Sequence, residues 1–557
     1  MDQLAHNGRG VMAPESVDVI VVGSGPVGAM AANLLGQYGL RTVVIEKETV
    51  PHTQSRAINA DDEAQRIFQA AGLTGELGPG FHPCLKMTYV DDEMRVLAEV
   101  DFTQVERPNG HFIGSLFSQP RLEASLTRGM GRFPSVSLWR GHEVESFMQD
   151  EDGVSVRVKE AATGRTLTLR ARYLLACDGA KSSIRRRLGL KLEGTTALAH
   201  ALAITVETPS SAPDFTYYPC GPKRVGIVTR TAHDEMRFDT VVRPGQDLEH
   251  VRSPEYVRGI IAPYIDPDSV RVKSVNLYAY HSRMAEKWRV GRVFLLGDAA
   301  HLMPPFLGQG VCSGLRDAAN LSWKIAHVLN GAAEASLLDT YEVERRPHAA
   351  EMMRMSDALG SMLSSGGPLM ARARNAFINL LYRMPVTGPF IREYKMKPNL
   401  FHAEGFLFGG KRGKSKQAGE GAYFPQPRVE HGEEGERPLD DVIGQRFAVL
   451  TRPGAPADVQ QAAKALAEDI GGVWLSVAPA ARSGAGRAGE VVDLEGKLGE
   501  WFAQHASDLV VLRPDRYVYA ATNRAGVAQV HAALKKDVRP FSRRGSRVSR
   551  RIASIGA

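Results

Sequence analysis

The segment Gly23-Ser-Gly25-Pro-Val-Gly28 constrains the fold more than any other part of the chain. It follows VDVIVV, an apolar run that begins at Val17 and is typical of a strand buried on both faces. After the glycines, apolar residues recur at helical spacing as far as Tyr38, and a second apolar run, TVVIE, ends at Glu46. This strand–helix–strand order predicts a Rossmann-like domain that binds a dinucleotide.

Each glycine has a separate physical role in such a turn. Gly23 permits the tight bend, Gly25 lets the backbone approach a pyrophosphate, and Gly28 lets the helix lie close to the sheet. The free N–H groups at the helix start favour phosphate, and an acidic residue at position 46 favours a ribose with a free 2′-OH, as in NAD or FAD. The residues expected to bind the cofactor here are Gly23, Gly25, Pro26, Val27, Gly28, Glu46 and Lys47.

A second segment, LLGDAAHLMPPFLGQG, runs from Leu295 to Gly310 and fits an isoalloxazine ring. Asp298 can bind ribityl hydroxyls, and the N–H groups near Gly310 and Val311 can face the pyrimidine edge, where charge collects when a flavin is reduced. Pro305, after Pro304, fixes the backbone beside the reacting face. The expected cofactor ligands here are Gly297, Asp298, Pro305, Gly308, Gly310 and Val311.

Three segments together resemble the fingerprints of the class A flavoprotein aromatic hydroxylases. They are Gly23 to Gly28, the step Cys177-Asp178-Gly179 that runs into Ser183-Ile184-Arg185, and Gly297-Asp298 followed by two prolines. The resemblance spans residues 17 to 350. Within that group, SRAI from Ser55, DTYEVERRPHA from Asp339 and WFAQHASDLVVLRPDRYV near the end are most similar to the 3-(3-hydroxyphenyl)propionate hydroxylases.

The resemblance implies roles for a few further residues. It places Arg56 near the FAD pyrophosphate or on the path of the flavin, with a catalytic role shared with Pro305, and it makes Gln119 an FAD contact. Asp178 is expected to help bind FAD and to shape the approach of NADH or NADPH. The simpler alternatives are a surface arginine at a helix entry for Arg56 and a polar helix-start residue for Gln119.

Substrate contacts are expected in the antiparallel segment that covers the flavin in the resembled fold. The candidates are His200, Tyr217, Tyr218, Arg230, His233 and Phe238, each of which could equally be a packing or surface residue. Arg230 or Arg237 could pair with a substrate carboxylate. No metal ligand set is expected.

The expected fold class is α/β: a Rossmann-like FAD-binding domain with an inserted mixed or antiparallel β-sheet substrate domain, a helical segment, and a C-terminal thioredoxin-like α/β domain. Strands are expected at 154–158, 171–177 and 292–297, and the glycines at 484, 486 and 489 are interpreted as a loop because no strand precedes them. The expected boundaries are a disordered N-terminal arm (1–16), the first part of the FAD domain with substrate-domain strands interleaved (17–195), the substrate sheet (196–285), the second part of the FAD domain with helices (286–400), a linker (401–438), the C-terminal domain (439–535) and a basic tail (536–557).

Composition excludes several classes of protein. No apolar run approaches the length of a membrane span, the N-terminus lacks a signal peptide's apolar centre, and a cytoplasmic location is the default expectation. The four cysteines form no C-x-x-C pair, which argues against a zinc site and against thiol redox chemistry in the C-terminal domain. The net charge of +7 arises in the last residues of the chain, so nucleic acid is not an expected partner.

The resemblance implies a mono-oxygenase that uses FAD, O2 and NADH or NADPH, and that hydroxylates a phenol through a flavin C4a-hydroperoxide. A homodimer is plausible by the same similarity. The alternatives are a nitrocatechol or other substituted-phenol mono-oxygenase, and a flavin-binding scaffold without activity. A halogenase is disfavoured because the five tryptophans, at 139, 288, 323, 474 and 501, do not form W-x-W.

Overall fold

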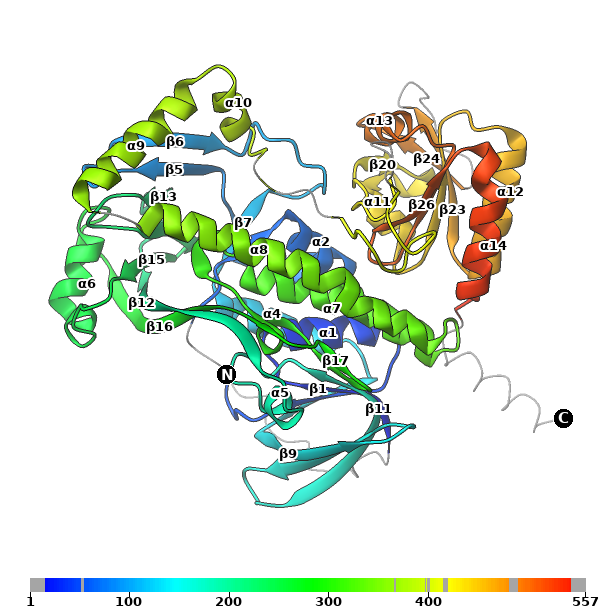
Figure 1. Cartoon of the computed structure of the whole chain (residues 1–557), viewed down its shortest axis with the longest axis horizontal. Helices are drawn as coiled ribbons and strands as arrows, with labels where there is room; N and C mark the ends of the chain where they lie inside the picture. The colour runs from blue at the N-terminus through cyan, green and yellow to red at the C-terminus, as the bar shows by residue number, and fades with distance from the viewer. Residues whose placement is uncertain are drawn as a thin grey trace.

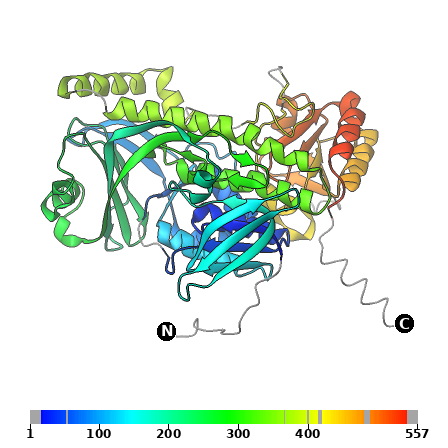
Figure 2. The same cartoon turned by 60° about the horizontal axis from the view of Figure 1, so that its bottom comes forward.

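A computed structural model describes residues 16–51, 55–364, 367–395, 397, 401–413, 419–479 and 489–541. The N-terminal arm before residue 16, the tail beyond residue 541, and the glycines at 484 and 486 lie outside the described residues. No described helix is both long enough and apolar enough to cross a bilayer. Figures 1 and 2 show an elongated molecule with the substrate sheet and α6 at one end and the C-terminal domain at the other.

The nucleotide domain is built on a sheet whose central strands are parallel. Its order is β17 (Arg289–Val290), β18 (Val293–Leu295), β11 (Thr166–Ala176), β1 (Val17–Val22), β2 (Thr42–Glu46) and β8 (Val136–Arg140). In addition, β10 (Val154–Glu160) pairs antiparallel with β11, and β9 (His142–Gln149) pairs antiparallel with β10. All of β1 and β2 is buried because α1 (Pro26–Gln37), α4 (Gln119–Met130) and α7 (Gly310–Leu329) pack nearby. The strands expected at 154–158, 171–177 and 292–297 are confirmed as β10, β11 and β18.

A second sheet of eight strands forms the substrate domain. Its order is β19 (His301–Leu302), β16 (Arg271–Ala285), β12 (Leu192–Glu207), β15 (Glu235–Val242), β14 (Gly226–Ala232), β13 (Thr216–Pro219), β5 (Lys86–Val90) and β6 (Val96–Asp101). One face is apolar and packs under α6 (Pro254–Ile261), with Phe238 and Ile204 fully buried. A small sheet of β3 (Asn59–Asp61), β7 (Gly114–Phe117) and β4 (Phe81–Pro83) lies between this domain and α2 (Asp62–Ala70).

The helical segment after α7 consists of α8 (Thr340–Ser364), α9 (Pro368–Arg383) and α10 (Thr387–Arg392). Figure 1 shows α8 running along the molecule from the substrate domain towards the C-terminal domain, with α9 and α10 outside β5 and β6. Two shorter helices, α3 (Thr74–Leu77) and α5 (Ser183–Arg187), lie earlier in the chain.

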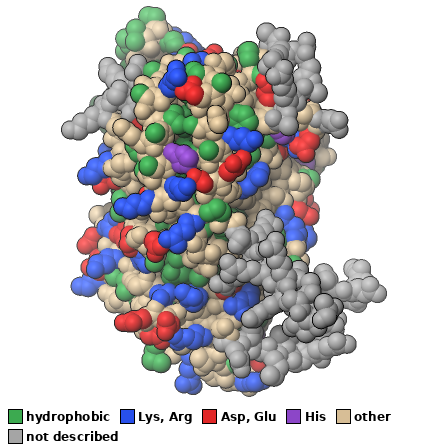
Figure 3. All heavy atoms as spheres, turned by 90° about the vertical axis from the view of Figure 1, so that its right-hand side faces the viewer, with side chains coloured by type: hydrophobic (Ala, Val, Ile, Leu, Met, Phe, Trp, Pro, Cys, Tyr) green, Lys and Arg blue, Asp and Glu red, His purple; other side chains and the backbone are tan. Residues whose placement is uncertain are grey.

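The C-terminal domain has its own seven-stranded sheet. Its order is β21 (Glu436–Pro438), β20 (Arg428–Glu430), β24 (Glu490–Asp493), β23 (Val473–Pro479), β22 (Ala448–Thr451), β25 (Leu509–Leu512) and β26 (Val518–Thr522). Its helices are α11 (Leu439–Ile443), α12 (Ala457–Ile470), α13 (Lys497–Gln504) and α14 (Val527–Asp537). On the face in Figure 3, acidic and basic side chains are interspersed.

The structure differs from the expected linker at 401–438. Strands β20 and β21 lie within that range and pair with the C-terminal sheet, and Phe424 and Val429 are fully buried in its core. The glycine, lysine and proline content of the range concealed these two strands, which are only three residues long each.

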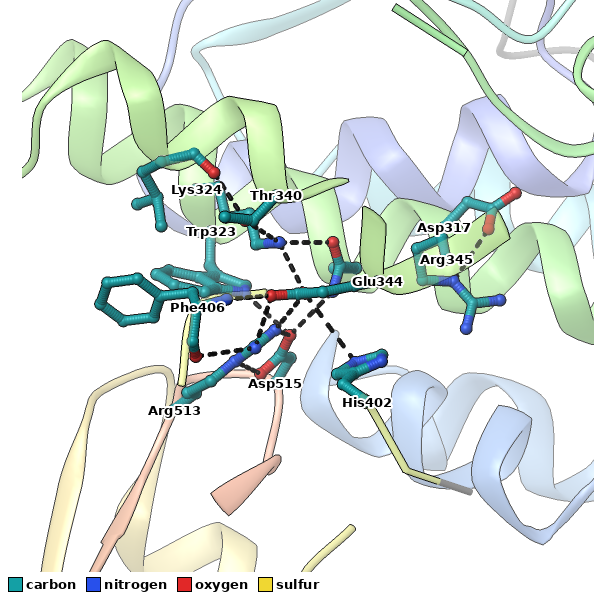
Figure 4. A network of polar contacts seen from close by, with 12 residues as sticks. Asp317, Trp323, Lys324, Thr340, Glu344, Arg345, His402, Phe406, Arg513 and Asp515 are labelled. Atoms are coloured by element: carbon teal, nitrogen blue, oxygen red, sulfur yellow. Dashed lines mark hydrogen bonds and ion pairs between the residues drawn. The ribbon is translucent and has the colours of Figure 1, made fainter. Parts of the chain in front are cut away.

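A buried ionic network joins the C-terminal domain to α7 and α8 (Figure 4). Arg513 donates from Nη1 and Nη2 to the two carboxylate oxygens of Glu344, at 2.8 Å each, and from Nε and Nη2 to Asp515. Its fifth N–H donates to the carbonyl of Phe406 at 3.2 Å. Every donor of this guanidinium is therefore used.

Lys324 completes the network from α7. Its ammonium donates to Asn320 Oδ1, Thr340 Oγ1 and Glu344 Oε2, at 2.8, 2.8 and 2.7 Å. Burial opposes ionisation of Glu344, but Arg513 and Lys324 lower its pKa well below the ordinary range. The two parts of the chain are thus joined by charges that satisfy one another.

Candidate functional site

The glycine turn packs in the way that its sequence predicts. Gly23 has a φ of 98°, and a Cβ on it would lie 2.4 Å from the carbonyl oxygen of Cys177. A Cβ on Gly28 would lie 2.0 Å from the carbonyl oxygen of Gly23. A Cβ on Gly25, in contrast, would meet nothing within 4 Å. The turn is therefore closed against β11 on one side and open to a ligand at Gly25.

Val27 is the point at which the separate segments meet. A Cβ on Gly297 would lie 2.9 Å from Val27 Cγ2, and a Cβ on Gly314 would lie 2.4 Å from the same atom. The start of α1, the turn at Asp298 and the start of α7 are consequently in direct contact. Two helix N-termini, each with a partial positive charge, adjoin the same place.

Glu46 supports the glycine turn from β2. Its carboxylate accepts hydrogen bonds from Ser24 N at 2.8 Å, Ser24 Oγ at 3.1 Å and Glu48 N at 3.0 Å. A carboxylate has about four acceptor positions, so one is left for a ribose hydroxyl. Lys47 is exposed and pairs with Glu48 at 3.7 Å.

Asp178 connects the end of β11 to α5. Its Oδ2 accepts from Ser183 N at 2.7 Å and Ile184 N at 3.1 Å, which caps the helix, while its Oδ1 is buried with no partner among the described residues. Arg185 then donates to the carbonyl of Ala299 at 2.9 Å. The Asp178 segment is thereby attached to the Asp298 turn.

Asp298 itself lies in a recess. Its side chain has exposed surface, yet protein surrounds it closely enough that burial raises its pKa, against the opposing effects of His301 and Arg56. The turn that carries it is fixed from behind by Asp317, which accepts from Gly297 N at 3.1 Å and from His301 Nε2 at 2.7 Å. A carboxylate in this position can accept hydrogen bonds from ribityl hydroxyls.

The turn from Pro305 to Gly310 forms another wall of the recess. Pro305 is exposed and Gly308 has a φ of 61°, while a Cβ on Gly310 would meet nothing within 4 Å. Val311 is half-buried in the first turn of α7. The ring of Phe306 packs edge-on against Tyr280 of β16, with centroids 5.5 Å apart. This contact brings the turn against the substrate sheet.

Gln119, the first residue of α4, holds residues 55–57, the segment called the strap below, which carries Arg56. The Oε1 of Gln119 accepts from Arg56 N at 2.8 Å and from Ala57 N at 2.9 Å, so Gln119 positions the strap. The side chain of Arg56 is exposed and lies close enough to Asp298 and Tyr278 to influence the ionisation of both. Its expected roles at the flavin and the expected FAD contact of Gln119 remain predictions.

The face of the substrate sheet that meets the strap is polar. Arg237 is buried, donates from Nη1 to the carbonyl of Ser55 at 2.7 Å and pairs with Asp239 at 2.5 Å. Strand register places Asp239 and Asn276 opposite Ala203, and Tyr278 opposite Ala201, which puts these side chains on the same face. Burial raises the pKa of Asp239, with Arg237 opposing, and raises the pKa of Tyr278.

The six expected substrate contacts do not gather on that face. Tyr218 lies on it, beside Tyr89 with ring centroids 5.3 Å apart. Tyr217 and Phe238 lie on the opposite face, where Tyr217 stacks on Phe215 and Phe238 is buried under α6.

The other three expected contacts are also directed elsewhere. Arg230 bonds to the backbone carbonyls of His233 and Ala212, so it fixes two loops. His233 is exposed in the turn between β14 and β15, and His200 is paired with Val242 on the α6 side. The roles of these six residues in substrate binding stay predictions, and strand register places Asp239 and Tyr278 on the face that meets the strap.

Asp239 and Tyr278 were not among the sequence candidates, because the sequence does not show which phase of an alternating strand lies on the face that meets the strap. In EMRFDTVV the charged residues alternate with Met236 and Phe238, which is the available signal. The two prolines, Gly308 and the carboxylates that follow strands can be recognised from neighbouring residues in the sequence. The choice of sheet face, in contrast, depends on packing against residues that are distant in the sequence.

Comparison with known proteins identifies the two parts of the chain. Residues 16–356 match the FAD binding domain family, and residues 421–537 match the HcaD C-terminal domain. The 3-(3-hydroxy-phenyl)propionate/3-hydroxycinnamic acid hydroxylase of Burkholderia cenocepacia is 36% identical over 535 residues, covering 93% of this chain and 96% of that protein. The enzyme of the same name from Klebsiella pneumoniae is 36% identical over 514 residues, covering 91% and 92%.

Solved structures agree on the fold. The flavin-dependent monooxygenase PieE, in complex with FAD and substrate, superposes with a TM-score of 0.78 at 24% identity, covering 94% of this chain and 99% of that one. The p-nitrophenol 4-monooxygenase PnpA of Pseudomonas putida has a TM-score of 0.62 at 26% identity, covering 69% and 98%. With the glycine turn, the Asp178 step and the Asp298 turn assembled around one recess, the chain belongs to the FAD-dependent aromatic hydroxylases and is a flavoprotein mono-oxygenase.

Proposed function

We propose that this enzyme uses NADH or NADPH and O2 to hydroxylate a phenol with a carboxylate side arm, of the 3-(3-hydroxyphenyl)propionate type. The observation that carries this proposal is the recess, which has Asp298 on the flavin side and Asp239 with Tyr278 on the sheet side. The exposed Arg56 lies close enough to Asp298 and Tyr278 to influence the ionisation of both. The names of the relatives at 36% identity support the substrate class.

The residues present fit an FAD molecule. The open approach at Gly25, the remaining acceptor position of Glu46 and the start of α1 would hold the ADP half, and Asp298 with the start of α7 would hold the flavin half. Bound FAD supplies the activation of oxygen. The chain contributes binding, orientation and the handling of the substrate's proton.

Asp239 is the group that we propose to withdraw the phenol proton. Its carboxylate is partly exposed on the recess side and is fixed by Arg237 behind it, so its direction is set before substrate arrives. Transfer of the hydroxyl proton to Asp239 makes the aromatic ring more electron-rich at the carbon that is attacked. Tyr278 stays protonated because burial raises its pKa, and its hydroxyl can donate to the substrate oxygen.

Arg56 is proposed to hold the carboxylate arm. Its side chain is exposed and lies close enough to Asp298 and Tyr278 to influence the ionisation of both, and a guanidinium binds a carboxylate through two parallel hydrogen bonds. Gln119 and Arg237 hold the peptide group that precedes Arg56, through Arg56 N and Ser55 O. The strap is therefore held by its backbone atoms, and the Arg56 guanidinium remains available for the substrate carboxylate.

The test is product formation over a panel of phenols, with and without a carboxylate arm, including p-nitrophenol and a nitrocatechol. We expect hydroxylated product from the propionate phenols, with kcat/KM about 10–100-fold above the matched phenols that lack the arm, as loss of a charged hydrogen bond predicts. A preference for nitrophenols would favour the substituted-phenol alternative, and no product from any phenol would contradict the proposal.

Asp239→Asn tests the role of the carboxylate. The expected loss in kcat is about 100-fold or more, because proton withdrawal contributes at least that factor, while FAD content and NADH oxidation without substrate stay near wild type. Asp234→Asn is the matched control, since Asp234 pairs with Arg121 in the turn before β15. Equal kcat in the two variants would contradict the role of Asp239.

A further inference from the structure

One row of side chains on the substrate sheet keeps exposed surface on the face that meets the strap. Asp239, Ile227, Tyr218 and Tyr89 occupy equivalent positions on the adjacent strands β15, β14, β13 and β5, so their side chains project from the same face. All four residues are partly exposed. Strand register therefore places four incompletely covered side chains in one line across the sheet.

The side chains that flank this row on the same face are buried. In a strand, the nearest neighbours on one face lie two residues before and after a given residue. Those neighbours of Ile227 and Tyr218 are all buried: Val225, Thr229, Thr216 and Cys220. Exposed surface that is confined to one row between buried rows forms a trough, which crosses the strands from Asp239 to Tyr89.

The end of the trough that is distant from Asp239 is aromatic. The rings of Tyr218 and Tyr89 have centroids 5.3 Å apart and planes inclined by 33°. Protein surrounds both rings closely enough that burial raises the pKa of each hydroxyl. A tyrosine that serves only for packing usually bonds its hydroxyl to another group, but neither of these hydroxyls has a hydrogen-bond partner among the described residues.

A third segment holds this aromatic end in place. Tyr394, which follows α10, has a φ of 53° and packs edge-on against Phe102, with ring centroids 5.1 Å apart. Ile391 and Tyr394 belong to the same apolar cluster as Tyr89 and Tyr218. Figure 1 shows α10 beside β5 and β6, at the end of the molecule that is distant from the nucleotide domain. The two tyrosines are thus fixed from behind and present their rings to the trough.

The trough is longer than one aromatic ring. Neighbouring strands lie about 4.8 Å apart, so Tyr218 is two strands and about 10 Å from Asp239, and Tyr89 is one strand further. A single six-membered ring with its hydroxyl at Asp239 ends before Tyr218. The remaining length is lined by Ile227 and the two tyrosine rings, on which a second aromatic ring can stack.

We propose that Tyr218 and Tyr89 form an aryl subsite, which takes the second aromatic ring of a two-ring phenol whose hydroxyl lies at Asp239. This rests on the proposed function, which places the phenol at Asp239. Arg56 influences Tyr278 of β16, and β16 lies on the other side of β15 from the two tyrosines. A carboxylate arm and a second ring therefore occupy different parts of the recess.

The test is the binding of two phenols without a carboxylate arm, 3-phenylphenol and 3-methylphenol, to the oxidised holoenzyme, followed by the change in flavin absorbance. We expect wild type to bind 3-phenylphenol about tenfold more tightly, as burial of a further ring predicts. Tyr218→Ala and Tyr89→Ala should each lower this ratio of affinities about 3–10-fold, as loss of an aromatic partner predicts. Tyr218→Phe keeps the ring and should keep the ratio.

Tyr217→Ala is the matched control. Tyr217 is the neighbouring residue in β13, but it stacks on Phe215 on the opposite face, with ring centroids 4.5 Å apart. This variant should lower the thermal unfolding midpoint and leave the ratio of affinities unchanged. Asp239→Asn should weaken the binding of both phenols alike. If it changed neither affinity, the placement of the phenol at Asp239 would be wrong, and the tyrosine variants would still decide on the aryl subsite.

Three outcomes would overturn the aryl subsite. The first is equal affinity of wild type for the two phenols. The second is an unchanged or raised ratio in both alanine variants, since a raised ratio would show that the tyrosines exclude the second ring. The third is an equal fall of the ratio in Tyr217→Ala, which would assign the effect to packing of the sheet. None of these measurements depends on turnover or on a carboxylate arm.

Discussion

The recess at Asp298 and the domain junction at Glu344 both gather buried charges, but they treat them differently. At the junction, Glu344 has no exposed surface, Arg513 and Lys324 use all their donors, and the pKa of Glu344 is lowered. In the recess, Asp298 and Asp239 keep some exposed surface and burial raises the pKa of each. Buried charged groups that are fully paired within the protein indicate a structural role. Charged groups with raised pKa that face a recess indicate a site that binds a ligand.

The largest effect is expected at the junction. Glu344→Ala leaves the buried Arg513 and Lys324 without their shared partner, and the free energy of unfolding should fall by about 3–5 kcal/mol. Urea denaturation followed by tryptophan fluorescence measures it, and the folded fraction should still bind FAD. The control is Glu404→Ala, which removes an exposed pair with Lys411 and should cost under about 1 kcal/mol. Equal losses of unfolding free energy in the two variants would contradict a special structural role of the buried pair at the junction.

The junction also predicts a dependence on acidity. The folded-state pKa of Glu344 lies below its unfolded value near 4.5, so its contribution is present above that value and is lost as pH falls through the folded-state pKa. Wild-type protein should therefore lose stability more steeply than Glu344→Gln as pH falls below about 4.5. Thermal unfolding midpoints between pH 6 and pH 3 check this, and parallel curves would contradict it.

The second effect is expected at the glycine turn. In Gly28→Ala the new Cβ would lie 2.0 Å from the carbonyl oxygen of Gly23, so the turn must open. We expect a cost of about 3 kcal/mol, the upper end for overpacking, which weakens FAD binding about 100-fold. Equilibrium titration of apoprotein with FAD measures it. Gly75→Ala is the control, since nothing lies within 4 Å of its Cβ, and similar affinities in both variants would contradict the close packing.

The third effect in size is expected at the recess carboxylate. Asp298→Ala should weaken FAD binding by about 1.5–3 kcal/mol, the range for a hydrogen bond to a charged group, with little change in the unfolding free energy of the apoprotein. Glu344→Ala is expected to lower the unfolding free energy and to leave FAD binding intact, whereas Asp298→Ala is expected to do the opposite. The reason is that no hydrogen bond to the Asp298 side chain is found among the described residues. Loss of stability without loss of FAD affinity would show that Asp298 is structural.

The sequence predicted the recess in part and the junction not at all. The turns at Gly23 and Asp298 depend on neighbours in the chain, so local spacing was sufficient to locate them. The polar sheet face required knowing which of two alternating sets points inwards, and Phe238 was chosen where Asp239 faces the recess. Glu344 and Arg513 are 169 residues apart, and no local pattern connects them.

The smallest effect is expected where a motif residue is supported redundantly. Ser24→Ala removes the bond from Ser24 Oγ to Glu46 at 3.1 Å, but the bonds from Ser24 N and Glu48 N to the same carboxylate remain. One neutral partner lost among three should cost about 0.5–1 kcal/mol and weaken FAD binding about two- to fivefold. The titration used for Gly28→Ala resolves this change, and Glu46→Gln in the same assay should lose more because it alters all three bonds at once. If Ser24→Ala weakened FAD binding as strongly as Gly28→Ala, the orientation of Glu46 would depend on the Ser24 hydroxyl. The remaining hydrogen bonds from Ser24 N and Glu48 N would then not compensate for its loss, and the glycine turn would resemble the Glu344 junction, where each bond is needed.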